Sequence, residues 1–231
     1  MYSHITDIFF DLDHTLWDFD KNSEKAFDLI FKNKYNHIDT AKFIAVYIPI
    51  NQACWKLYQQ DKITHIELRY QRLKQSFDAL SVEISDEEIE KIATEYIEYL
   101  PQFNELFDHT IEVLDYLKTK YNLHIITNGF AEVQDKKLRN SNISHYFKTI
   151  TNSEMANAKK PNPIIFDHAL QLANATKNNS IMIGDCIDAD VQGALNFGIS
   201  AIFFNPNGYS SPNNIIQINN LYQLKKIFSY D

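Results

Sequence analysis

Hydrophobic and polar positions follow two different rhythms along this chain. Over residues 19–100, apolar side chains recur every three or four positions, a spacing that places them on one face of an α-helix. Capping-box patterns at Thr64 and at Ser85 predict helix starts inside this block. The apolar faces expected after them are Ile66, Tyr70, Leu73, Phe77 and Leu80, and then Ile89, Ile92, Tyr96 and Leu100. This block therefore predicts a helical bundle.

The remainder of the chain alternates short apolar runs with helical patterns. The runs that predict β-strands are residues 5–10, 123–127, 149–151, 180–183 and 199–204. Helical patterns lie between them, including one over residues 188–197 that ends before Gly198. Asn205 to Asn220 is rich in Asn, Pro and Ser and predicts a loop. Such alternation is typical of a parallel sheet with helices on both faces.

We therefore predict an α/β protein in which a helical bundle interrupts the sheet-containing part. The expected boundaries assign residues 1–18 and 101–231 to an α/β core and residues 19–100 to the inserted bundle. The length of 231 residues and an apolar content of 45% are sufficient for both parts to bury a hydrophobic core.

Charge and cysteine content limit the environments and partners that we expect. A net charge of −8 without a basic run argues against binding to a nucleic-acid polymer. No signal-peptide pattern or membrane-spanning apolar stretch is evident, and Cys54 and Cys186 do not form a disulfide framework. We expect a cytoplasmic protein with no membrane association, either a monomer or a small homo-oligomer. The net charge is compatible with a small phosphorylated metabolite as partner, because one local cation or metal can override the global sign.

Polar residues follow several of the predicted strands. In open α/β sheets, ligands bind just outside the carboxyl ends of the strands, so these residues are expected to meet at one edge. The first and last groups in chain order are rich in carboxylates, which resist close approach unless a cation compensates them. The polar positions at strand ends and in the following loops are Asp11, Asp13, Thr127, Asn128, Lys160, Asp185, Asp188 and Asp190.

The acidic members of this group have a coherent chemistry. A carboxylate can attack phosphorus to form an aspartyl-phosphate, and a second carboxylate two residues later can protonate the leaving oxygen and then activate water. Asp11 and Asp13 have this spacing. Asp185 and Asp190 can complete an oxygen site that suits Mg²⁺. Asp188 is an additional acid, which we interpret as a helix-capping residue.

The other polar residues suit the binding of phosphate. The Thr127 hydroxyl and the backbone N–H groups of the Asn128-Gly129 turn can hold phosphoryl oxygens. Lys160 can neutralise the negative charge that develops during phosphoryl transfer.

Four segments of the chain resemble the four motifs of the haloacid dehalogenase-like (HAD) hydrolases. These segments are Asp11–Thr15, Ile125–Gly129, Lys160–Pro161 and Gly184–Asp190. The resemblance implies a Rossmann-like core with a helical cap, and the Mg²⁺-dependent hydrolysis of phosphoric monoesters through an aspartyl-phosphate. It also implies that Thr127 and Lys160 hold the phosphate.

The same resemblance assigns roles to the acidic residues. It implies that Asp11 is the nucleophile and that Asp13 is the general acid and base. It implies Mg²⁺ binding by Asp11, by the backbone carbonyl of Asp13 and by Asp185, with Asp190 in a supporting position.

The inserted bundle resembles a helical cap of this superfamily. Trp55, Tyr58 and residues 63–72 are similar to the YjjG-like branch of pyrimidine 5′-nucleotidases, which implies a nucleoside 5′-monophosphate as substrate. The residues that we consider for substrate recognition are Trp17, Arg69 and Arg72. Packing within the bundle, or a position on its surface, is the alternative explanation for these aromatic and basic residues.

Other functions on the same scaffold remain open at this point. A sugar-phosphate phosphatase or a phosphomutase would use the same pair of aspartates. A 2-haloacid dehalogenase is disfavoured because that branch lacks the acid at the position of Asp13. A non-enzymatic phosphate-binding regulator is disfavoured because both catalytic acids are present and a cap is expected.

Overall fold

The computed structural model describes residues 2–210, 212 and 215–229 of the chain. It contains two compact units: Met1–Asp18 with Glu105–Asp231, called the core unit below, and Phe19–Asn104, called the helical unit. The chain returns from the helical unit to the core unit after Asn104, later than the expected boundary at residue 100. The reason is that a 3₁₀ turn, Leu100–Gln102, packs against the first and last helices of the helical unit. No helix within the described ranges has the length and apolar character needed to cross a membrane.

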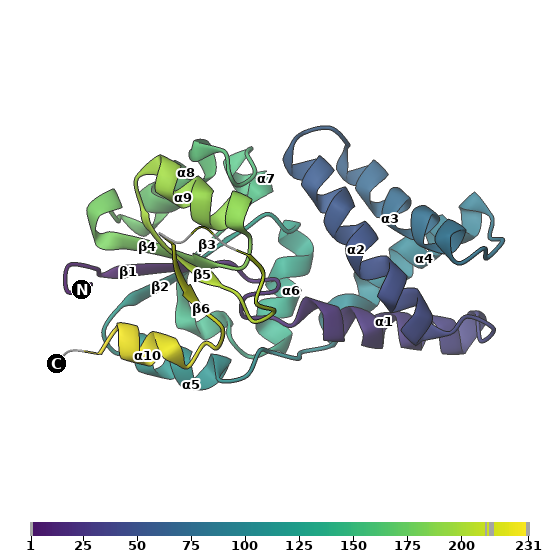
Figure 1. Ribbon diagram of the computed structural model, residues 1–231, viewed down its shortest axis with the longest axis horizontal. Coiled ribbons are helices and arrows are strands. Elements are labelled where there is room, and N and C mark those ends of the chain that lie inside the picture. The colour runs from purple at the N-terminus through teal and green to yellow at the C-terminus, as the bar shows by residue number, and fades with distance from the viewer. Residues whose placement is uncertain (1, 211, 213–214, 230–231) are drawn as a thin grey trace. The chain divides into compact units, whose positions relative to one another are not determined.

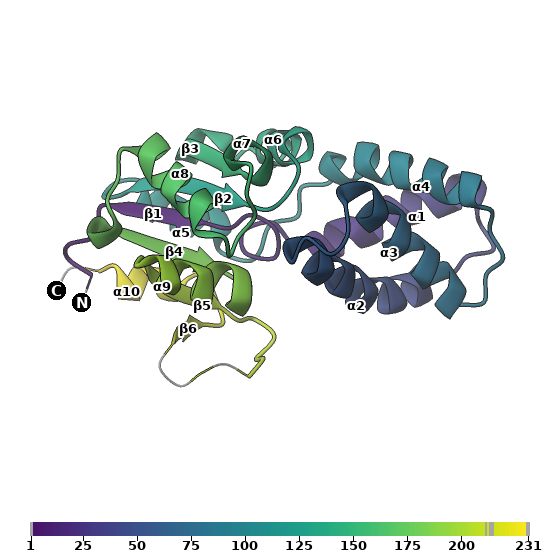
Figure 2. The same ribbon diagram turned by 90° about the horizontal axis from the view of Figure 1, so that it is seen from above.

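The core unit is built on a six-stranded sheet whose order is β3-β2-β1-β4-β5-β6. Figure 2 shows this order across the sheet. Every neighbouring pair of strands is parallel, which confirms the predicted α/β fold. The strands are β1 (Asp7–Phe10), β2 (Asn122–Thr127), β3 (Phe147–Asn152), β4 (Ser180–Gly184), β5 (Ser200–Phe204) and β6 (Ile216–Ile218).

Helices cover both faces of this sheet. Figure 1 shows α8 and α9 on one face and α5 and α10 on the other. The helices of the core unit are α5 (Thr110–Leu117), α6 (Ala131–Asn140), α7 (Ser153–Ala156), α8 (Pro163–Ala173), α9 (Gly193–Phe197) and α10 (Gln223–Ile227). Alternate strand residues face α8 and α9 and form a buried apolar layer with them. Its larger members are Phe9, Ile126, Ile165, Phe166, Met182 and Phe203.

The loop predicted over Asn205–Asn220 contains the short strand β6. Ile216 and Gln217 are exposed and only Ile218 is buried. A strand of this length at the edge of a sheet has too few alternating positions to be detected from its pattern. Residues 211, 213 and 214 of the predicted loop lie outside the described residues.

The helix predicted over residues 188–197 is divided in two. A π-helical turn, Ile187–Gln192, precedes α9. The Cys186 carbonyl accepts hydrogen bonds from the backbone N–H groups of Asp190 and Val191, at 2.9 and 3.2 Å, which makes this turn wider than an α-helical one. The helix ends at Gly198 as predicted, with a φ of 96° that favours glycine.

The helical unit contains four helices around an aromatic core. They are α1 (Phe19–Lys34), α2 (Thr40–Gln59), α3 (His65–Ala79) and α4 (Asp86–Tyr99). The rings of Phe27 and Tyr96 stack with their centroids 4.4 Å apart, which links α1 to α4. Other rings of this core are Phe31, Phe43, Tyr47 and Phe77. Both capping boxes are present at the predicted residues, Thr64 and Ser85.

The buried face of α3 differs from the prediction at its start. Ile66 is 68% exposed, whereas Leu68 and Arg72 are buried together with Leu73 and Phe77. The apolar spacing fits either face in the first turn, and packing against the aromatic core selects the one that carries Arg72.

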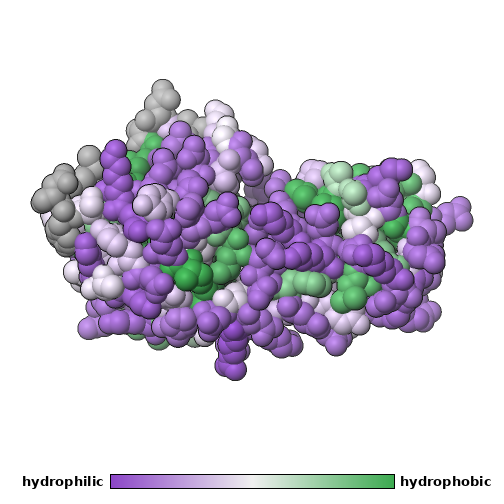
Figure 3. Space-filling model, turned by 90° about the horizontal axis from the view of Figure 1, so that it is seen from below, coloured by the Kyte–Doolittle hydropathy of each residue, from purple (hydrophilic) through white to green (hydrophobic). Residues whose placement is uncertain are grey.

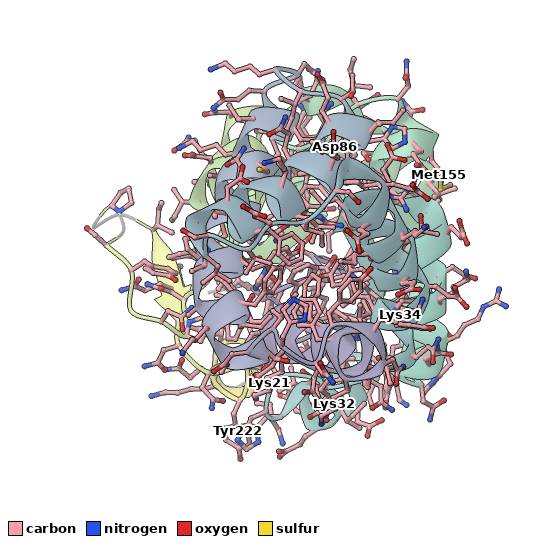
Figure 4. The ribbon with its side chains drawn as sticks, turned by 90° about the vertical axis from the view of Figure 1, so that its right-hand side faces the viewer. Lys21, Lys32, Lys34, Asp86, Met155 and Tyr222 are labelled. Atoms are coloured by element: carbon pink, nitrogen blue, oxygen red, sulfur yellow. The ribbon has the colours of Figure 1, made fainter. Side chains whose placement is uncertain are left out.

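Hydrophilic residues cover most of the molecular face seen in Figure 3, with apolar groups scattered among them. Charged side chains of the helical unit, including Lys32, Lys34 and Asp86, are labelled in Figure 4. Lys32 pairs with Asp28 one helical turn earlier, and Lys34 pairs with Glu95 of α4. Exposed pairs of this kind contribute little to stability, so burial of the aromatic core carries most of the stability of the helical unit.

Candidate active site

The candidate active site lies where the strand order reverses, between β1 and β4. Asp11 directly follows β1, Asp185 follows β4, and Thr127 ends the neighbouring strand β2. The carboxyl ends of parallel strands meet at one edge of a sheet, and a reversal of strand order leaves room for a ligand there. The topology therefore brings together residues that are far apart in the sequence.

Three carboxylates form a close cluster at this edge. Asp11, Asp185 and Asp190 each offer an oxygen atom, and these atoms lie within 4.8 Å of one another. The approach of Asp190 requires the glycine at position 184, because a Cβ atom there would lie 2.3 Å from Asp190 Oδ2. The backbone N–H of Cys186 also donates to Asp190 Oδ2, at 3.0 Å. Asp190 is thereby held in one place by the turn that follows β4.

Lys160 supplies a buried positive charge to this cluster. Its Nζ atom lies 2.6 Å from Asp11 Oδ1, 2.6 Å from Asp190 Oδ1 and 2.7 Å from the Ile126 carbonyl oxygen. The Asn128 side chain holds the Lys160 backbone by accepting from its N–H at 2.7 Å and donating to its carbonyl at 3.0 Å. This contact engages one of the two amide N–H groups of Asn128, so among the described residues the second N–H is left for a further acceptor.

The charges of the cluster are incompletely compensated. Burial raises the pKa of the Asp11 carboxyl well above its ordinary range, and Lys160 only partly opposes this effect. Burial, together with the neighbouring Asp190, raises the pKa of Asp185 to about 8. Burial alone would lower the pKa of Lys160, but Asp11 and Asp190 raise it above its ordinary value. Lys160 therefore remains charged, and the carboxylates can accept a further cation.

The donor set fits a hard divalent cation such as Mg²⁺. All three side chains of the cluster offer carboxylate oxygens, which are the donors that Mg²⁺ prefers. The Thr15 hydroxyl donates to Asp185 Oδ1 at 3.1 Å and orients that carboxylate. The thiol of Cys186, which adjoins Asp185 in the chain, accepts a hydrogen bond from the Ala189 N–H, and burial raises its pKa to about 12. A thiol in this state is a poor metal ligand.

The Thr127 hydroxyl is oriented by its neighbours. Its oxygen accepts hydrogen bonds from the Gly129 N–H at 3.1 Å and from Gln134 Nε2 at 2.8 Å. A hydroxyl oxygen has two acceptor positions and one proton to donate. Both acceptor positions are therefore taken, and the hydroxyl proton is left for a further acceptor.

Asp13 lies outside the three-carboxylate cluster. Its Oδ1 accepts from Lys137 Nζ at 2.6 Å and its Oδ2 accepts from Gln134 Nε2 at 2.9 Å. Both donors come from α6. The carboxylates of Asp13 and Asp11 thus have different hydrogen-bond partners, although only one residue lies between them in the sequence.

The remaining candidates have other surroundings. Trp17 is fully buried in the core unit, where the Lys137 ammonium lies 4.3 Å from the centroid of its ring system, and this position favours packing over contact with a substrate. Arg69 and Arg72 both lie on α3 of the helical unit, Arg69 partly exposed and Arg72 buried. Asp188 is exposed in the π-helical turn and is not part of the three-carboxylate cluster.

Three polar residues near the site were not singled out in the sequence. Thr15 lies within the first motif, but nothing local indicates its contact with Asp185. Gln134 and Lys137 are three residues apart on α6, a spacing that indicates a shared helix face but not what that face contacts. Their partner Asp13 lies more than a hundred residues earlier, at separations of 121 and 124 residues.

Residues 7–198 match the family described as haloacid dehalogenase-like hydrolase. The chain belongs to this family. The match confirms the family that the four motifs indicated.

Two characterised relatives cover most of this hydrolase. Pyrimidine 5′-nucleotidase PynA of Streptococcus pneumoniae is 32% identical over 201 residues, which are 86% of this hydrolase and 83% of PynA. Pyrimidine 5′-nucleotidase YjjG of Escherichia coli is 28% identical over 224 residues, which are 95% and 96% of the two chains. These relatives bear out the resemblance to pyrimidine nucleotidases in the sequence.

A solved structure with the same fold is the HAD-hydrolase YfnB of Bacillus subtilis, described as bound to magnesium and as revealing interdomain movement. The two structures superpose with a TM-score of 0.87 at 26% sequence identity. The superposition covers 96% of this hydrolase and 98% of YfnB. A structural relative that aligns with both units of this hydrolase is therefore described with bound magnesium.

Proposed function

We propose that this hydrolase releases inorganic phosphate from small phosphate monoesters through an aspartyl-phosphate on Asp11. The observation that carries the proposal is the buried pair of Asp11 and Lys160, 2.6 Å apart at the point where the strand order reverses. The Thr127 hydroxyl, which keeps its own proton to donate, and the charged Lys160 supply the donors that the phosphoryl group needs.

The proposed reaction has two steps. In the first, an Asp11 carboxylate oxygen bonds to phosphorus while the bond from phosphorus to the leaving oxygen breaks, and that oxygen takes a proton from Asp13. In the second, Asp13 takes a proton from water, and the water oxygen bonds to phosphorus as the bond to Asp11 breaks. Inorganic phosphate leaves, and both carboxyl groups return to their starting states.

We propose Mg²⁺ as the cofactor. Asp11, Asp185 and the backbone carbonyl of Asp13 would hold it, while Asp190 remains with Lys160 and the Cys186 N–H. When bound, Mg²⁺ would offset part of the negative charge of the carboxylates and of the phosphate dianion. The raised pKa values of Asp11 and Asp185 support this assignment, because they indicate a site short of positive charge.

We propose a pyrimidine nucleoside 5′-monophosphate as the preferred substrate. PynA and YjjG, which are named as pyrimidine 5′-nucleotidases, support this choice. A second support is Arg72, which is only 2% exposed. One of its nitrogens, Nη1, donates to Asn51 at 3.3 Å, while Nε and Nη2 have no hydrogen-bond partner among the described residues.

A buried guanidinium with unused donors suits an acceptor-rich group. The Arg72 guanidinium carbon also lies 4.9 Å from the centroid of the Tyr96 ring, a cation–π contact that favours this position of the side chain. Carbonyl oxygens on a pyrimidine base are acceptors of the required kind, so we assign base recognition to Arg72, with the partly exposed Arg69 of α3 as a second candidate.

The test is phosphate release from a panel of compounds, with Mg²⁺ and with excess chelator. We expect UMP and TMP to have higher kcat/KM values than purine nucleotides or hexose phosphates, and we expect the chelator to abolish turnover. A higher value for a hexose phosphate would reject the nucleotide assignment but leave the phosphatase intact. Interconversion of phosphosugar isomers without phosphate release would instead identify a phosphomutase.

A further inference from the structure

Two side chains of α6 hold both oxygens of the Asp13 carboxylate. Lys137 Nζ donates to Oδ1 at 2.6 Å, and Gln134 Nε2 donates to Oδ2 at 2.9 Å. We propose that Lys137 and Gln134 are positioning residues that fix the Asp13 carboxylate in the orientation needed for proton transfer. This inference rests on the function proposed above, in which Asp13 exchanges protons with the leaving group and with water.

Lys137 is itself held in place. Its side chain is 2% exposed, and its ammonium group lies 4.3 Å from the centroid of the Trp17 ring system. Backbone hydrogen bonds fix Trp17 in turn, because its N–H donates to the Leu12 carbonyl at 2.9 Å and its carbonyl accepts from the His14 N–H at 2.9 Å. The ammonium group therefore contacts both the Trp17 ring and the Asp13 carboxylate. The segment after β1 thus supplies the carboxylate that Lys137 binds and also the ring that holds Lys137 in place.

Gln134 connects Asp13 to the phosphate-binding threonine. Its amide nitrogen donates one proton to Asp13 Oδ2 and the other to Thr127 Oγ1, at 2.8 Å. A carboxyl oxygen that carries no proton only accepts hydrogen bonds, so the amide presents its nitrogen to Asp13 Oδ2. Gly129 permits the close approach, because a Cβ atom there would lie 2.4 Å from Gln134 Nε2.

The contacts of Lys137 differ from those of the other charged residues of α6. Lys136 pairs with Glu132, and Arg139 pairs with Asp135, each four residues earlier on the exposed side of the helix. Such pairs stabilise a helix slightly. The Lys137 side chain instead contacts Asp13, a residue 124 positions earlier, in the loop that follows β1 at the candidate active site. Local helix stabilisation does not account for this contact.

The geometry leaves room for a proton on Asp13. A carboxylate has about four lone-pair positions, and α6 occupies one on each oxygen. The remaining positions stay available while the plane of the carboxylate is fixed. Without the two donors the side chain can rotate, and proton delivery to the leaving oxygen becomes less frequent.

Leaving groups of different basicity distinguish positioning from a purely structural role. The 5′-oxygen of UMP needs a proton as it departs, whereas 4-nitrophenolate departs readily without one. The value of kcat/KM reports the steps up to departure of the leaving group. A misoriented Asp13 should therefore reduce kcat/KM for UMP much more than for 4-nitrophenyl phosphate.

The experiment compares Lys137→Met and Gln134→Met with Lys136→Met, a matched control that removes the neighbouring exposed lysine of the same helix. We expect kcat/KM for UMP to fall on the order of 10²-fold in the first two variants, mainly through kcat. The value for 4-nitrophenyl phosphate should fall much less, and Lys136→Met should match the wild type with both substrates. Lys137→Arg should restore part of the activity because it retains a donor to Asp13.

An equal loss with both substrates in folded Lys137→Met and Gln134→Met would overturn the inference, and so would wild-type kinetics in both. Thermal unfolding identifies a variant that does not fold, and the other variant then decides the outcome. Failure of the proposed function is recognised separately, since the wild-type enzyme with Mg²⁺ would then release phosphate from neither substrate.

Discussion

The Nζ atom of Lys160 lies 2.6 Å from Oδ1 of Asp11, and both side chains are buried. Breaking a buried ion pair by removing one partner leaves a charge without compensation. Asp190 reduces this effect in Asp11 variants, since it also lies 2.6 Å from Lys160 Nζ. The chain can therefore lose the Asp11 charge and still keep Lys160 paired.

This relationship makes Asp11→Asn a suitable test of the nucleophile. The substitution keeps the shape of the side chain but removes the attacking charge, so phosphatase activity should fall to background while the thermal unfolding transition persists. Asp188→Asn, which changes an exposed acid near the same site, is the control and should retain activity. Wild-type phosphate release by purified Asp11→Asn would reject the aspartyl-phosphate mechanism.

The raised pKa of Asp185, about 8, predicts how Mg²⁺ binding depends on pH. Between its ordinary value of 3.8 and about 8, the folded protein retains a proton that an unfolded chain has already lost. The contribution of this group to the stability of the metal-free fold is therefore fully present below pH 3.8 and is lost as the pH rises toward about 8. Because Mg²⁺ requires deprotonated ligands, the increase in Tm caused by Mg²⁺ should be larger at about pH 8 than at about pH 6.

The control for this measurement is Asp185→Asn, which removes the titrating group. Its Mg²⁺-dependent increase in Tm should be small at both pH values. An increase in the wild-type protein that does not change with pH would argue against competition between protons and the metal.

Arg72→Met tests whether the buried guanidinium serves stability or binding. No carboxylate of the described residues forms an ion pair with Arg72, and replacement of a buried, poorly compensated charge by an apolar side chain is often neutral or stabilising. We therefore expect an unchanged or raised Tm together with a higher KM for UMP. The KM for 4-nitrophenyl phosphate should not change, because that substrate lacks a pyrimidine base.

Lys74→Met on the same helix is a suitable control, since Lys74 pairs with Asp78 in the exposed i, i+4 arrangement. It should leave both KM values unchanged. A clear loss of stability in Arg72→Met with an unaltered KM would assign Arg72 to packing and remove it from the recognition site.

Gly184→Ala should disturb the carboxylate cluster directly. The added Cβ would lie 2.3 Å from Asp190 Oδ2 and 2.5 Å from Asp190 Cβ, so rotation of the Asp190 side chain cannot relieve the overlap. We expect a loss of about 1–3 kcal/mol in the free energy of unfolding and a marked loss of activity. Denaturant unfolding and phosphate release measure the two effects.

Gly208→Ala separates this steric effect from backbone strain. Gly208 has a φ of 69°, but among the described residues other than Gly208 and its two chain neighbours no atom lies within 4 Å of the position that its Cβ would take. Its substitution should lower stability without lowering activity. Equal activities of the Gly184 and Gly208 variants would contradict the role given to Asp190.

Local features of the sequence determined the elements and their type. The capping boxes at Thr64 and Ser85 are hydrogen-bonded as expected, because donor and acceptor are only three residues apart and their geometry depends on a single helical turn. The alternation of apolar runs with helical patterns determined the parallel sheet, and with it the edge at which Asp11, Thr127 and Asp185 meet.

Tertiary packing decided which residues surround these candidates. Lys137 and Gln134 reach Asp13 only because α6 is placed beside the loop after β1, and no short-range pattern encodes that contact. Likewise, the aromatic core of the helical unit selects which face of α3 is buried, and so leaves Ile66 exposed and Arg72 inside. Short-range hydrogen bonds depend on residues that are close in the sequence and can be predicted from them. The partner of a buried charge depends instead on how whole helices and strands pack.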